Sequence, residues 1–481
     1  MNAQDLKLAT RRRWLLLAAA GISAGAIPLL GRTDEEHHDD FDAEDAYRSG
    51  ENSSFTLANT GLNARIVVVG GGMAGATAAK YLRLWGGAGL DVTLVEPNAS
   101  YTSNIMSNLV LNGSRTTASL DFGYSQLAAK YGVKLKQAKV VAVDRANRQV
   151  SLSDNTVLPY DRLILAPGVE FMEAHGLTQA DYASRTPHAW QAGPQTTLLA
   201  RQLGAMSNGG TFVMTIPKAP YRCPPGPYER ACLVADYLKA SGRSGAKVLV
   251  LDENPPKPGG DRYSAIQAEA HTFTTAFSVT HASVIEYVSG VSGIQIDPAT
   301  QAVSYTDSTG THQVAAQVVN PIPPHRAAGS SAGGWLASAG LNNSADGRWC
   351  VVDVLSYEST VPAAAGIHVL GDASSCGMPK AGHVANQEAK ICADAIVRLL
   401  GGGQPDPAPV ANSACYSPVT AGTASWLTVV YQYDGVNRKM VPAFNGGVTA
   451  GATPIESATV SSGNFRQMNT WFNTLMGDSF A

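Results

Sequence analysis

The sequence predicts an α/β protein with two Rossmann-like dinucleotide-binding domains and a small α+β domain at its C-terminal end. Three observations lead to this prediction. The apolar residues 65–69 run into a glycine cluster and then into a helical pattern. A second unit of strand, loop and helix begins at residue 211 and closes with the apolar residues 246–252. The chain has 481 residues, of which 44% are hydrophobic, and this length suits about three domains.

We predict five segments from composition and pattern. They are a leader at residues 1–30, an acidic linker at 31–60, a discontinuous first domain at 61–187 and 322–402, a second domain at 188–321, and a C-terminal domain at 403–481.

The leader is predicted to be an export signal. A twin arginine in residues 10–15 precedes an apolar stretch that ends near residue 27, and residues 24–26 are small. An uncleaved membrane anchor is the alternative, but the apolar stretch is short for a bilayer span. We therefore expect twin-arginine export to the periplasm, without stable membrane insertion afterwards. The acidic run at residues 34–40 is typical of a solvated tail, and no metal site is predicted there.

Charge and cysteine content exclude several classes of protein. The net charge is −3 and no basic stripe is present, so no nucleic-acid partner is expected. Six cysteines are too few for a disulfide-stapled scaffold, and none forms a Cys-x-x-Cys pair. The chain also has no Cys-x-x-Cys-His sequence for attaching a c-type haem. Any haem in its chemistry would belong to a partner.

The glycine cluster has the spacing of a dinucleotide-binding turn. Gly70, Gly72 and Gly75 match G-x-G-x-x-G between the strand and the helix that continues to about residue 84. A second apolar strand, residues 91–95, ends at Glu96, which lies 24 residues after Gly72. A carboxylate at this point can bind a ribose hydroxyl. The order of strand, glycines, helix, strand and acid therefore predicts a dinucleotide site.

Two further turns favour FAD over a nicotinamide as the dinucleotide. An apolar strand ends in Ala166-Pro-Gly168, and a later strand ends in Gly-Asp at Asp372. In flavoproteins with two dinucleotide domains, the aspartate of such a turn binds the ribityl chain. A helix is expected to begin near residue 382 with its positive end towards the flavin, and Lys380 could add to that charge.

The second unit lacks the usual phosphate-binding loop. Between the strand at residues 211–216 and the following helix stand five prolines, which have no backbone N–H to offer a pyrophosphate. Cys223 stands among them. We therefore expect a flavin but no nicotinamide site, so that the electrons come from another donor.

Cys223 is the strongest candidate for redox chemistry. It precedes a helix predicted to start at residue 226 or 227, and such a position lowers a thiol pKa. Arg222 adds positive charge, and Glu229 could take up a proton from a substrate. Cys376, shortly after Asp372, competes as the redox partner. The other cysteines carry no such signal: Cys232, Cys350 and Cys392 fit core positions, and Cys415 has no local chemical context.

The chain resembles the flavoprotein subunit of flavocytochrome c sulfide dehydrogenase, a glutathione-reductase-like family related to sulfide:quinone reductase. The likeness extends from about residue 64 to the C-terminal end. Its motifs are residues 69–81, 187–193, 219–231, 322–326, 349–350, 371–373, 378–382 and 414–417.

The resemblance implies a site that the local pattern does not reveal. It implies a redox disulfide between Cys223 and Cys415, with Glu229 as the acid–base group beside it. Well-studied members of the family hold FAD through a cysteine, but this chain has Asn104 there and no cysteine between residues 61 and 222. We therefore expect FAD to bind non-covalently.

The activity implied is oxidation of sulfide to sulfur or polysulfide, with electrons passing through FAD to a c-type cytochrome. Hydrosulfide would attack the disulfide and leave a persulfide and a thiolate. One alternative is a sulfide:quinone reductase, although residues 405–481 are mostly polar and glycine-rich. The other is a flavoprotein without turnover that binds sulfur or docks a cytochrome.

Overall fold

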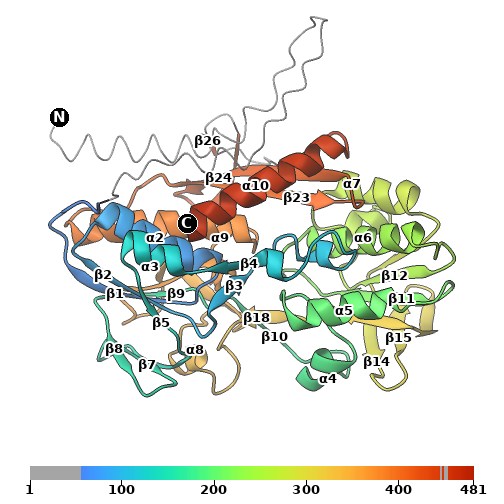
Figure 1. Ribbon diagram of the computed structural model, residues 1–481, viewed down its shortest axis with the longest axis horizontal. Coiled ribbons are helices and arrows are strands. Elements are labelled where there is room, and N and C mark those ends of the chain that lie inside the picture. The colour runs from blue at the N-terminus through green and yellow to red at the C-terminus, as the bar shows by residue number, and fades with distance from the viewer. Residues whose placement is uncertain (1–55, 445–446, 449–452) are drawn as a thin grey trace, which may run out of the picture. The chain divides into compact units, whose positions relative to one another are not determined.

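The computed structural model describes residues 56–481, apart from 445–446 and 449–452. The predicted export signal and residues 31–55 of the predicted linker lie outside the described residues. Figure 1 shows the arrangement of the helices and strands.

Strand β1 (Ala64–Val69) lies inside an eight-stranded sheet. It pairs in parallel with β2 (Leu90–Val95) on one side and with β9 (Arg162–Leu165) on the other. The apolar sequence of β1 suits this place, because an inner parallel strand is covered on both faces. β21 (Ile367–Val369) pairs in parallel with β9, so strands far apart in the chain share the sheet. The remaining strands are β5 (Lys134–Lys136) beside β2, and β20 (Glu358–Ser359), β19 (Cys350–Asp353) and β22 (Ser374–Ser375) beyond β21.

Helices α2 (Met73–Gly86) and α9 (Gly382–Leu400) pack against each other and against this sheet (Figure 1). Their contact faces are rich in buried alanines, which let the two backbones approach closely. Both helices start at the carboxyl ends of sheet strands, and such ends of an open α/β sheet are where ligands bind.

The second sheet is fully parallel and carries the proline loop. Its order is β13 (Ile285–Ser289), β12 (Lys247–Asp252), β11 (Thr211–Ile216) and β17 (Val318–Pro321). After β11 the chain passes through the prolines into α6 (Gly226–Ala240). The face of α6 towards the sheet is fully buried, and each buried aliphatic side chain stabilises the fold by roughly 1.5–3 kcal/mol. The predicted start of this helix is confirmed.

The C-terminal part of the chain forms an antiparallel sheet and a long helix. Strands β23 (Val410–Pro418) and β24 (Ala424–Asp434) pair over their whole length, followed by β25 (Lys439–Phe444), β26 (Gly447–Val448) and β27 (Ile455–Glu456). Helix α10 (Ser462–Phe480) packs on α2 and β24, and Phe480 stacks on Tyr101 with ring centroids 5.2 Å apart. Strand β23 also contacts α6 and α9. It is thereby held between one helix from each of the two dinucleotide units.

The other elements surround these three groups. They are β3 (Ser100–Thr102), η2 (Ser107–Val110), η3 (Ala118–Leu120), β4 (Asp121–Gly123), α3 (Ser125–Tyr131), β6 (Val140–Asp144), β7 (Gln149–Leu152), β8 (Val157–Pro159), β10 (Val169–Phe171), α4 (Gln179–Ser184), α5 (Pro194–Gly204), η4 (Arg262–Ala265), α7 (Ala270–Thr275), η5 (Ala276–Thr280), β14 (Ser292–Ile296), β15 (Ala302–Asp307), β16 (Gly310–Ala315), β18 (His325–Ala327), α8 (Trp335–Ser338) and η6 (Gly371–Ala373).

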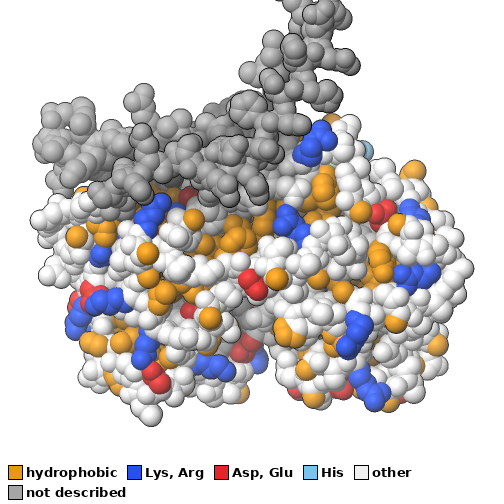
Figure 2. All heavy atoms as spheres, in the orientation of Figure 1, with side chains coloured by type: hydrophobic (Ala, Val, Ile, Leu, Met, Phe, Trp, Pro, Cys, Tyr) orange, Lys and Arg blue, Asp and Glu red, His pale blue; other side chains and the backbone are white. Residues whose placement is uncertain are grey.

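The α/β fold with a dinucleotide-binding arrangement is confirmed, while the predicted domain boundaries stay a prediction. Figure 2 shows Lys and Arg side chains spread over the described part of one face among uncharged atoms. Within the described residues, no helix is both long and apolar enough to cross a membrane. The same residues contain no cluster of three or more His, Cys, Asp or Glu that could hold a metal ion.

Candidate active site

One cavity of about 570 Å³ gathers most of the residues predicted from the sequence. Its volume is within the range of small-molecule and cofactor sites. The cavity lies where the eight-stranded sheet, α6 and β23 meet. The predicted residues that line it are Gly70, Gly72, Glu96, Asn104, Ala166, Gly168, Cys223, Glu229, Asp372 and Cys415. Gly75 and Lys380 are not among its lining residues.

The glycine turn after β1 shows why this loop needs missing side chains. Gly70 has a positive φ of 95°, and a Cβ there would lie 2.2 Å from the carbonyl oxygen of Ala166. A Cβ on Gly75 would lie 1.8 Å from the carbonyl oxygen of Gly70, so Gly75 serves the packing of the turn. Gly72 differs, because a Cβ there meets only Tyr101, at 3.8 Å. The missing side chain of Gly72 leaves open space on the cavity wall. A pyrophosphate needs such space to approach the backbone closely.

Asp372 presents an unpaired acceptor to the same cavity. Its Oδ1 is buried without a hydrogen-bond partner in the described structure, and burial raises the pKa of this carboxyl. The carboxylate of Glu388 accepts a 2.6 Å bond from the N–H of Gly371 and so fixes the turn. An orphaned buried acceptor is costly unless a ligand donates to it. A ribityl hydroxyl is such a donor, so the residues present fit FAD.

Glu96 is held beside the glycine turn. Its Oε2 accepts a 2.8 Å bond from the N–H of Gly71, and its Oε1 accepts bonds from the backbone and side-chain nitrogens of Asn98 at 3.0 and 2.7 Å. The carboxylate therefore lines the cavity next to the turn, as the predicted ribose contact requires.

Asn104 also lines the cavity, at the place of the family's linking cysteine. Its side-chain Oδ1 accepts a 2.8 Å bond from the N–H of Ala192, and its carbonyl accepts a 2.8 Å bond from the hydroxyl of Ser107. The carboxamide thus ties the first dinucleotide unit to the segment that leads into α5.

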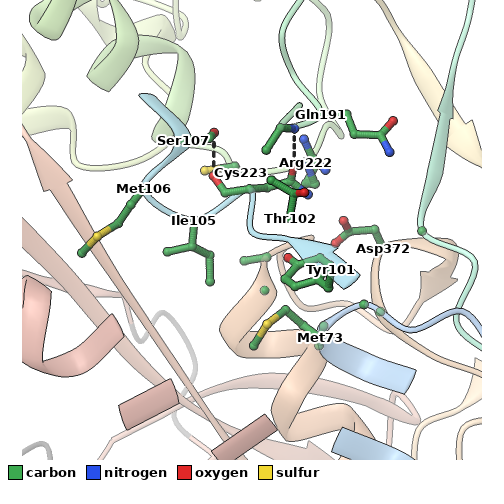
Figure 3. Close-up of a pocket in the computed structure, with 18 of the residues that line it drawn as sticks. Met73, Tyr101, Thr102, Ile105, Met106, Ser107, Gln191, Arg222, Cys223 and Asp372 are labelled. Carbon is green, nitrogen blue, oxygen red and sulfur yellow. Dashed lines mark hydrogen bonds between the residues drawn. The ribbon is translucent and has the colours of Figure 1, made fainter. Parts of the chain in front are cut away.

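The proline loop holds Cys223 in a left-handed conformation, with φ of 58°. Its N–H donates to the carbonyl of Lys380 at 2.8 Å, and its own carbonyl accepts from the N–H of Gly226 at 2.9 Å. Figure 3 shows Cys223 and Arg222 on the cavity wall near Tyr101 and Asp372. A non-glycine residue with positive φ persists only where its surroundings fix it, and such residues concentrate at active sites.

The expected lowering of the Cys223 pKa is wrong. Burial raises the pKa of this thiol to about 12, and the nearby carboxyl of Glu229 raises it further. The charge of Arg222 and the N–H of Gly226 act in the opposite direction but do not outweigh burial. Gly226 is the first residue of α6, and the lowering by its N–H is smaller than the raising by burial.

Cys415 lies on the same cavity although 192 residues separate it from Cys223. It stands on β23 opposite Leu427 of β24. Burial and then the charge of Cys223 raise the pKa of its thiol well above the usual value. The structure records both as free thiols.

Glu229 is buried at the start of α6 in a hydrogen-bonded chain. The side-chain N–H of Asn108 donates to its Oε1 at 2.8 Å, and Arg230 Nε donates to the Oδ1 of Asn108 at 2.8 Å. Arg230 also donates to the carbonyls of His188 and Ala189, at 2.8 and 2.7 Å. Burial raises the pKa of Glu229 to about 7, so it can both take up and release a proton near neutral pH.

Asn108 and Arg230 are site residues that the sequence analysis did not single out. Arg230 stands next to Glu229, which could have drawn attention to it. Asn108 has no local sequence signal, because its role depends on a loop of the first unit meeting a helix of the second.

Lys380 and Cys376 lie beside the main cavity. The Lys380 ammonium donates to the carbonyl of Ser374 at 2.6 Å and lies 3.8 Å from the centre of the Trp349 ring. The Cys376 thiol is buried and donates to Glu388 at 3.0 Å. Both line a small pocket next to Asp372. The core positions expected for Cys232, Cys350 and Cys392 are confirmed, since all three are fully buried.

Gly226 provides the room for the Cys223 sulfur. A Cβ at this position would lie 2.7 Å from Cys223 Sγ and 2.9 Å from the Trp190 ring. We expect Gly226→Ala to destabilise the protein by about 1–3 kcal/mol through overpacking and to slow alkylation of Cys223. Thermal unfolding and mass-spectrometric alkylation rates measure the two effects.

The matched control for this change is Gly204→Ala, where the added Cβ would meet only the Tyr237 hydroxyl, at 3.8 Å. Equal alkylation rates of Cys223 in Gly226→Ala and in this control would contradict the packing argument.

The comparisons with known proteins agree with this geometry. Residues 196–323 match the family described as the central region of the sulfide dehydrogenase (flavocytochrome c) flavoprotein chain. Residues 64–192 match the family described as pyridine nucleotide-disulphide oxidoreductase.

Curated relatives match over a short part of the chain. The probable ferredoxin reductase CtmF of Castellaniella defragrans is 38% identical over 109 residues, which are 22% of this chain and 26% of that protein. The ferroptosis suppressor protein 1 of Taeniopygia guttata is 36% identical over 104 residues, with 22% and 26% covered. The chain thus spans about a quarter of the length of these relatives.

Solved structures match over most of the chain. The sulfide:quinone oxidoreductase of Aquifex aeolicus has a TM-score of 0.68 at 18% identity, with 86% of this chain and 92% of that chain covered. The covalent putidaredoxin reductase–putidaredoxin complex gives 0.56 at 19% identity, with 76% and 82% covered. At such identities the likeness shows the fold alone.

The family matches confirm the resemblance that the motifs predicted. The dinucleotide turn lies in the first matched region, and Cys223 and Glu229 lie in the second. The chain therefore combines a region that matches the pyridine nucleotide-disulphide oxidoreductase family with a region that matches the central part of the sulfide dehydrogenase (flavocytochrome c) flavoprotein chain.

Proposed function

We propose that this protein is an exported, FAD-dependent sulfide dehydrogenase that passes electrons to a c-type cytochrome. The observation that carries the proposal is the meeting of Cys223, Cys415 and Glu229 on one cavity with the glycine turn and Asp372. Two thiols and a carboxyl line a cavity that fits a flavin. This arrangement suits an electron donor that reacts with cysteine sulfur.

The chemistry assigned to the thiols is disulfide exchange. In the oxidised enzyme, Cys223 and Cys415 form a disulfide. Hydrosulfide attacks one sulfur, a new sulfur–sulfur bond forms, and the Cys223–Cys415 bond breaks to give a persulfide and a thiolate. Glu229, whose pKa lies near 7, takes up the proton that the substrate sulfur releases. Bound FAD would supply an acceptor for the two electrons of the thiols. A reduced flavin can pass these electrons one at a time to a haem.

The position of Asn104 supports non-covalent FAD, because a carboxamide cannot form the thioether of a linking cysteine. The absence of a haem-attachment sequence in the whole chain supports a separate cytochrome as the electron acceptor. Export to the periplasm rests on the twin arginine of the leader.

Anaerobic titration of the purified protein tests the proposal. We expect sulfide to bleach the flavin absorbance at about one equivalent, and oxidised cytochrome c to restore it. NADH should leave the flavin oxidised, because prolines occupy the second loop. Bleaching by NADH but not by sulfide would show that sulfide is not the electron donor. Restoration by a soluble quinone but not by cytochrome c would favour a sulfide:quinone reductase.

A further inference from the structure

The backbones that carry the two thiols are both tied to one short segment, residues 380–383, which we call the α9 entry. The N–H of Cys223 donates to the carbonyl of Lys380 at 2.8 Å. The N–H of Ala414, the residue before Cys415, donates to Nδ1 of His383 at 2.9 Å. Helix α9 begins inside this segment. The α9 entry therefore holds the proline loop on one side and β23 on the other.

The α9 entry is itself fixed in place. The Lys380 ammonium donates to the carbonyl of Ser374 at 2.6 Å. A Cβ on Gly382 would lie 2.8 Å from the side chain of Ile105, so the backbone packs closely there. Residues 381–383 and Ile105 also line the main cavity (Figure 3). A segment held in this way can set the separation of the two groups that are bonded to it.

Strand β23 depends on a partner outside its own sheet. It stands at one edge of that sheet and has β24 on its other side. In an antiparallel pair the N–H groups of alternate residues point towards the partner strand, and those between them point away. The N–H of Ala414 points away, to His383, and Ala414 is only 3% exposed. Without His383 this buried donor would lose its acceptor, which is costly.

The His383 ring is held with its acceptor towards β23. The side chain is buried, and burial lowers the pKa of His383 to about 4, so the imidazole is neutral at neutral pH. A neutral imidazole has one nitrogen that accepts and one that carries the proton. Since Nδ1 accepts from Ala414, the proton is on Nε2. The ring also meets Trp471 of α10 edge to face, with centroids 5.9 Å apart.

We propose that His383 is a positioning residue of the thiol pair, which fixes β23 to the α9 entry and thereby sets how readily Cys223 and Cys415 form a disulfide. The inference rests on the proposed function only in taking these two cysteines as the pair that forms the disulfide. Two groups that are held in place react at a high effective concentration. A loosened β23 should therefore favour the two free thiols.

Equilibration with thiol–disulfide redox buffers tests the inference. The purified flavoprotein is incubated without oxygen in buffers that span the glutathione and dithiothreitol couples, then quenched with acid and alkylated. Mass spectrometry counts the free thiols of Cys223 and Cys415. When the protein disulfide forms, the two thiols lose two protons and two electrons, and the disulfide of the buffer is reduced to thiols.

Variants of His383 separate the role of Nδ1 from that of Nε2. His383→Phe should shift the equilibrium about tenfold towards the dithiol, which is about 30 mV for a two-electron couple. His383→Asn places a carboxamide oxygen at the level of Nδ1, where it can accept from Ala414, so we expect nearly the wild-type equilibrium. His383→Gln places its carboxamide at the level of Nε2 and should behave like His383→Phe.

His281→Phe is the matched control. His281 is also fully buried, and its Nε2 donates to the carbonyl of Val419 at 3.0 Å, just after β23 ends. Neither His281 nor Val419 lines the main cavity. This variant should lose thermal stability as His383→Phe does but leave the thiol equilibrium nearly unchanged.

Hydrogen exchange of the β23 peptide provides a second readout that needs no redox step. Exchange at Ala414 should be faster in His383→Phe and His383→Gln than in the wild type and His383→Asn. If His383→Phe does not fold, the comparison of the Asn and Gln variants decides.

An unchanged thiol equilibrium in folded His383→Phe, or an equal shift in His281→Phe, would overturn the inference. Restoration by Gln but not by Asn would overturn it as well, because the role would then belong to Nε2. A wild type that forms no Cys223–Cys415 disulfide would overturn both this inference and the proposed function. Failure of the proposed function alone would appear as a flavin that sulfide does not bleach although the disulfide forms and depends on His383.

Discussion

Cys223→Ser is expected to lower the rate of sulfide-dependent flavin reduction by about 10³-fold or more, which is the order lost when one member of a catalytic unit is removed. A serine hydroxyl cannot form the disulfide or leave as an anion near neutral pH. Cys415→Ser should have an effect of the same size, and the double variant should be no worse than either single one. Stopped-flow recording of flavin absorbance after mixing with sulfide measures all three.

The control is Cys376→Ser, which changes the competing thiol beside Asp372. Cys376 donates to Glu388 at 3.0 Å outside the main cavity, and a serine hydroxyl can make the same bond. We expect this variant to keep at least half of the wild-type rate. A large loss in Cys376→Ser with little loss in Cys223→Ser would move the redox role to Cys376.

Two glycine variants should separate folding from FAD binding. Gly70→Ala should destabilise the apoprotein by about 3 kcal/mol or more, because the added Cβ meets the Ala166 carbonyl at 2.2 Å and the backbone has positive φ. Gly72→Ala should leave apoprotein stability nearly unchanged, since its Cβ meets only Tyr101 at 3.8 Å. It should weaken FAD binding about tenfold or more, because the pyrophosphate approaches this backbone closely.

Urea unfolding of the apoprotein and FAD titration by flavin fluorescence measure the two effects. Gly123→Ala is the matched control, because a Cβ at that position meets nothing within 4 Å. Wild-type FAD affinity in Gly72→Ala would show that the dinucleotide does not approach the backbone at this turn.

Local pattern predicted the first dinucleotide unit well. The structure places β1, the glycine turn, α2, β2 and Glu96 in the predicted order, and the predicted start of α9 at residue 382 is confirmed. These features can be predicted because the turn, the strand and the helix are contiguous in sequence. Gly75 is required by the carbonyl of Gly70 in the same short unit, whereas Gly70 is required by the carbonyl of Ala166 from a later part of the chain.

The chemistry of the thiols was harder to predict. A helix N-terminus three residues away suggested a lowered Cys223 pKa, but burial and Glu229 raise it. Desolvation depends on everything packed around the sulfur, including β23 from a distant part of the chain. Asn108 and Arg230 were passed over for the same reason, since Asn108 bonds to both Glu229 and Arg230 from more than 100 positions away.

The sequence by itself determined the α/β class, the FAD-type turns and the exchange of a phosphate loop for prolines and Cys223, because each is a local consequence of residue type. It identified Cys415 only through the family resemblance. The tertiary structure decided that Cys415, Glu229 and Asp372 meet on one cavity. These relations depend on how β23 packs against α6 and α9, and burial and charge then set the proton affinity of each group.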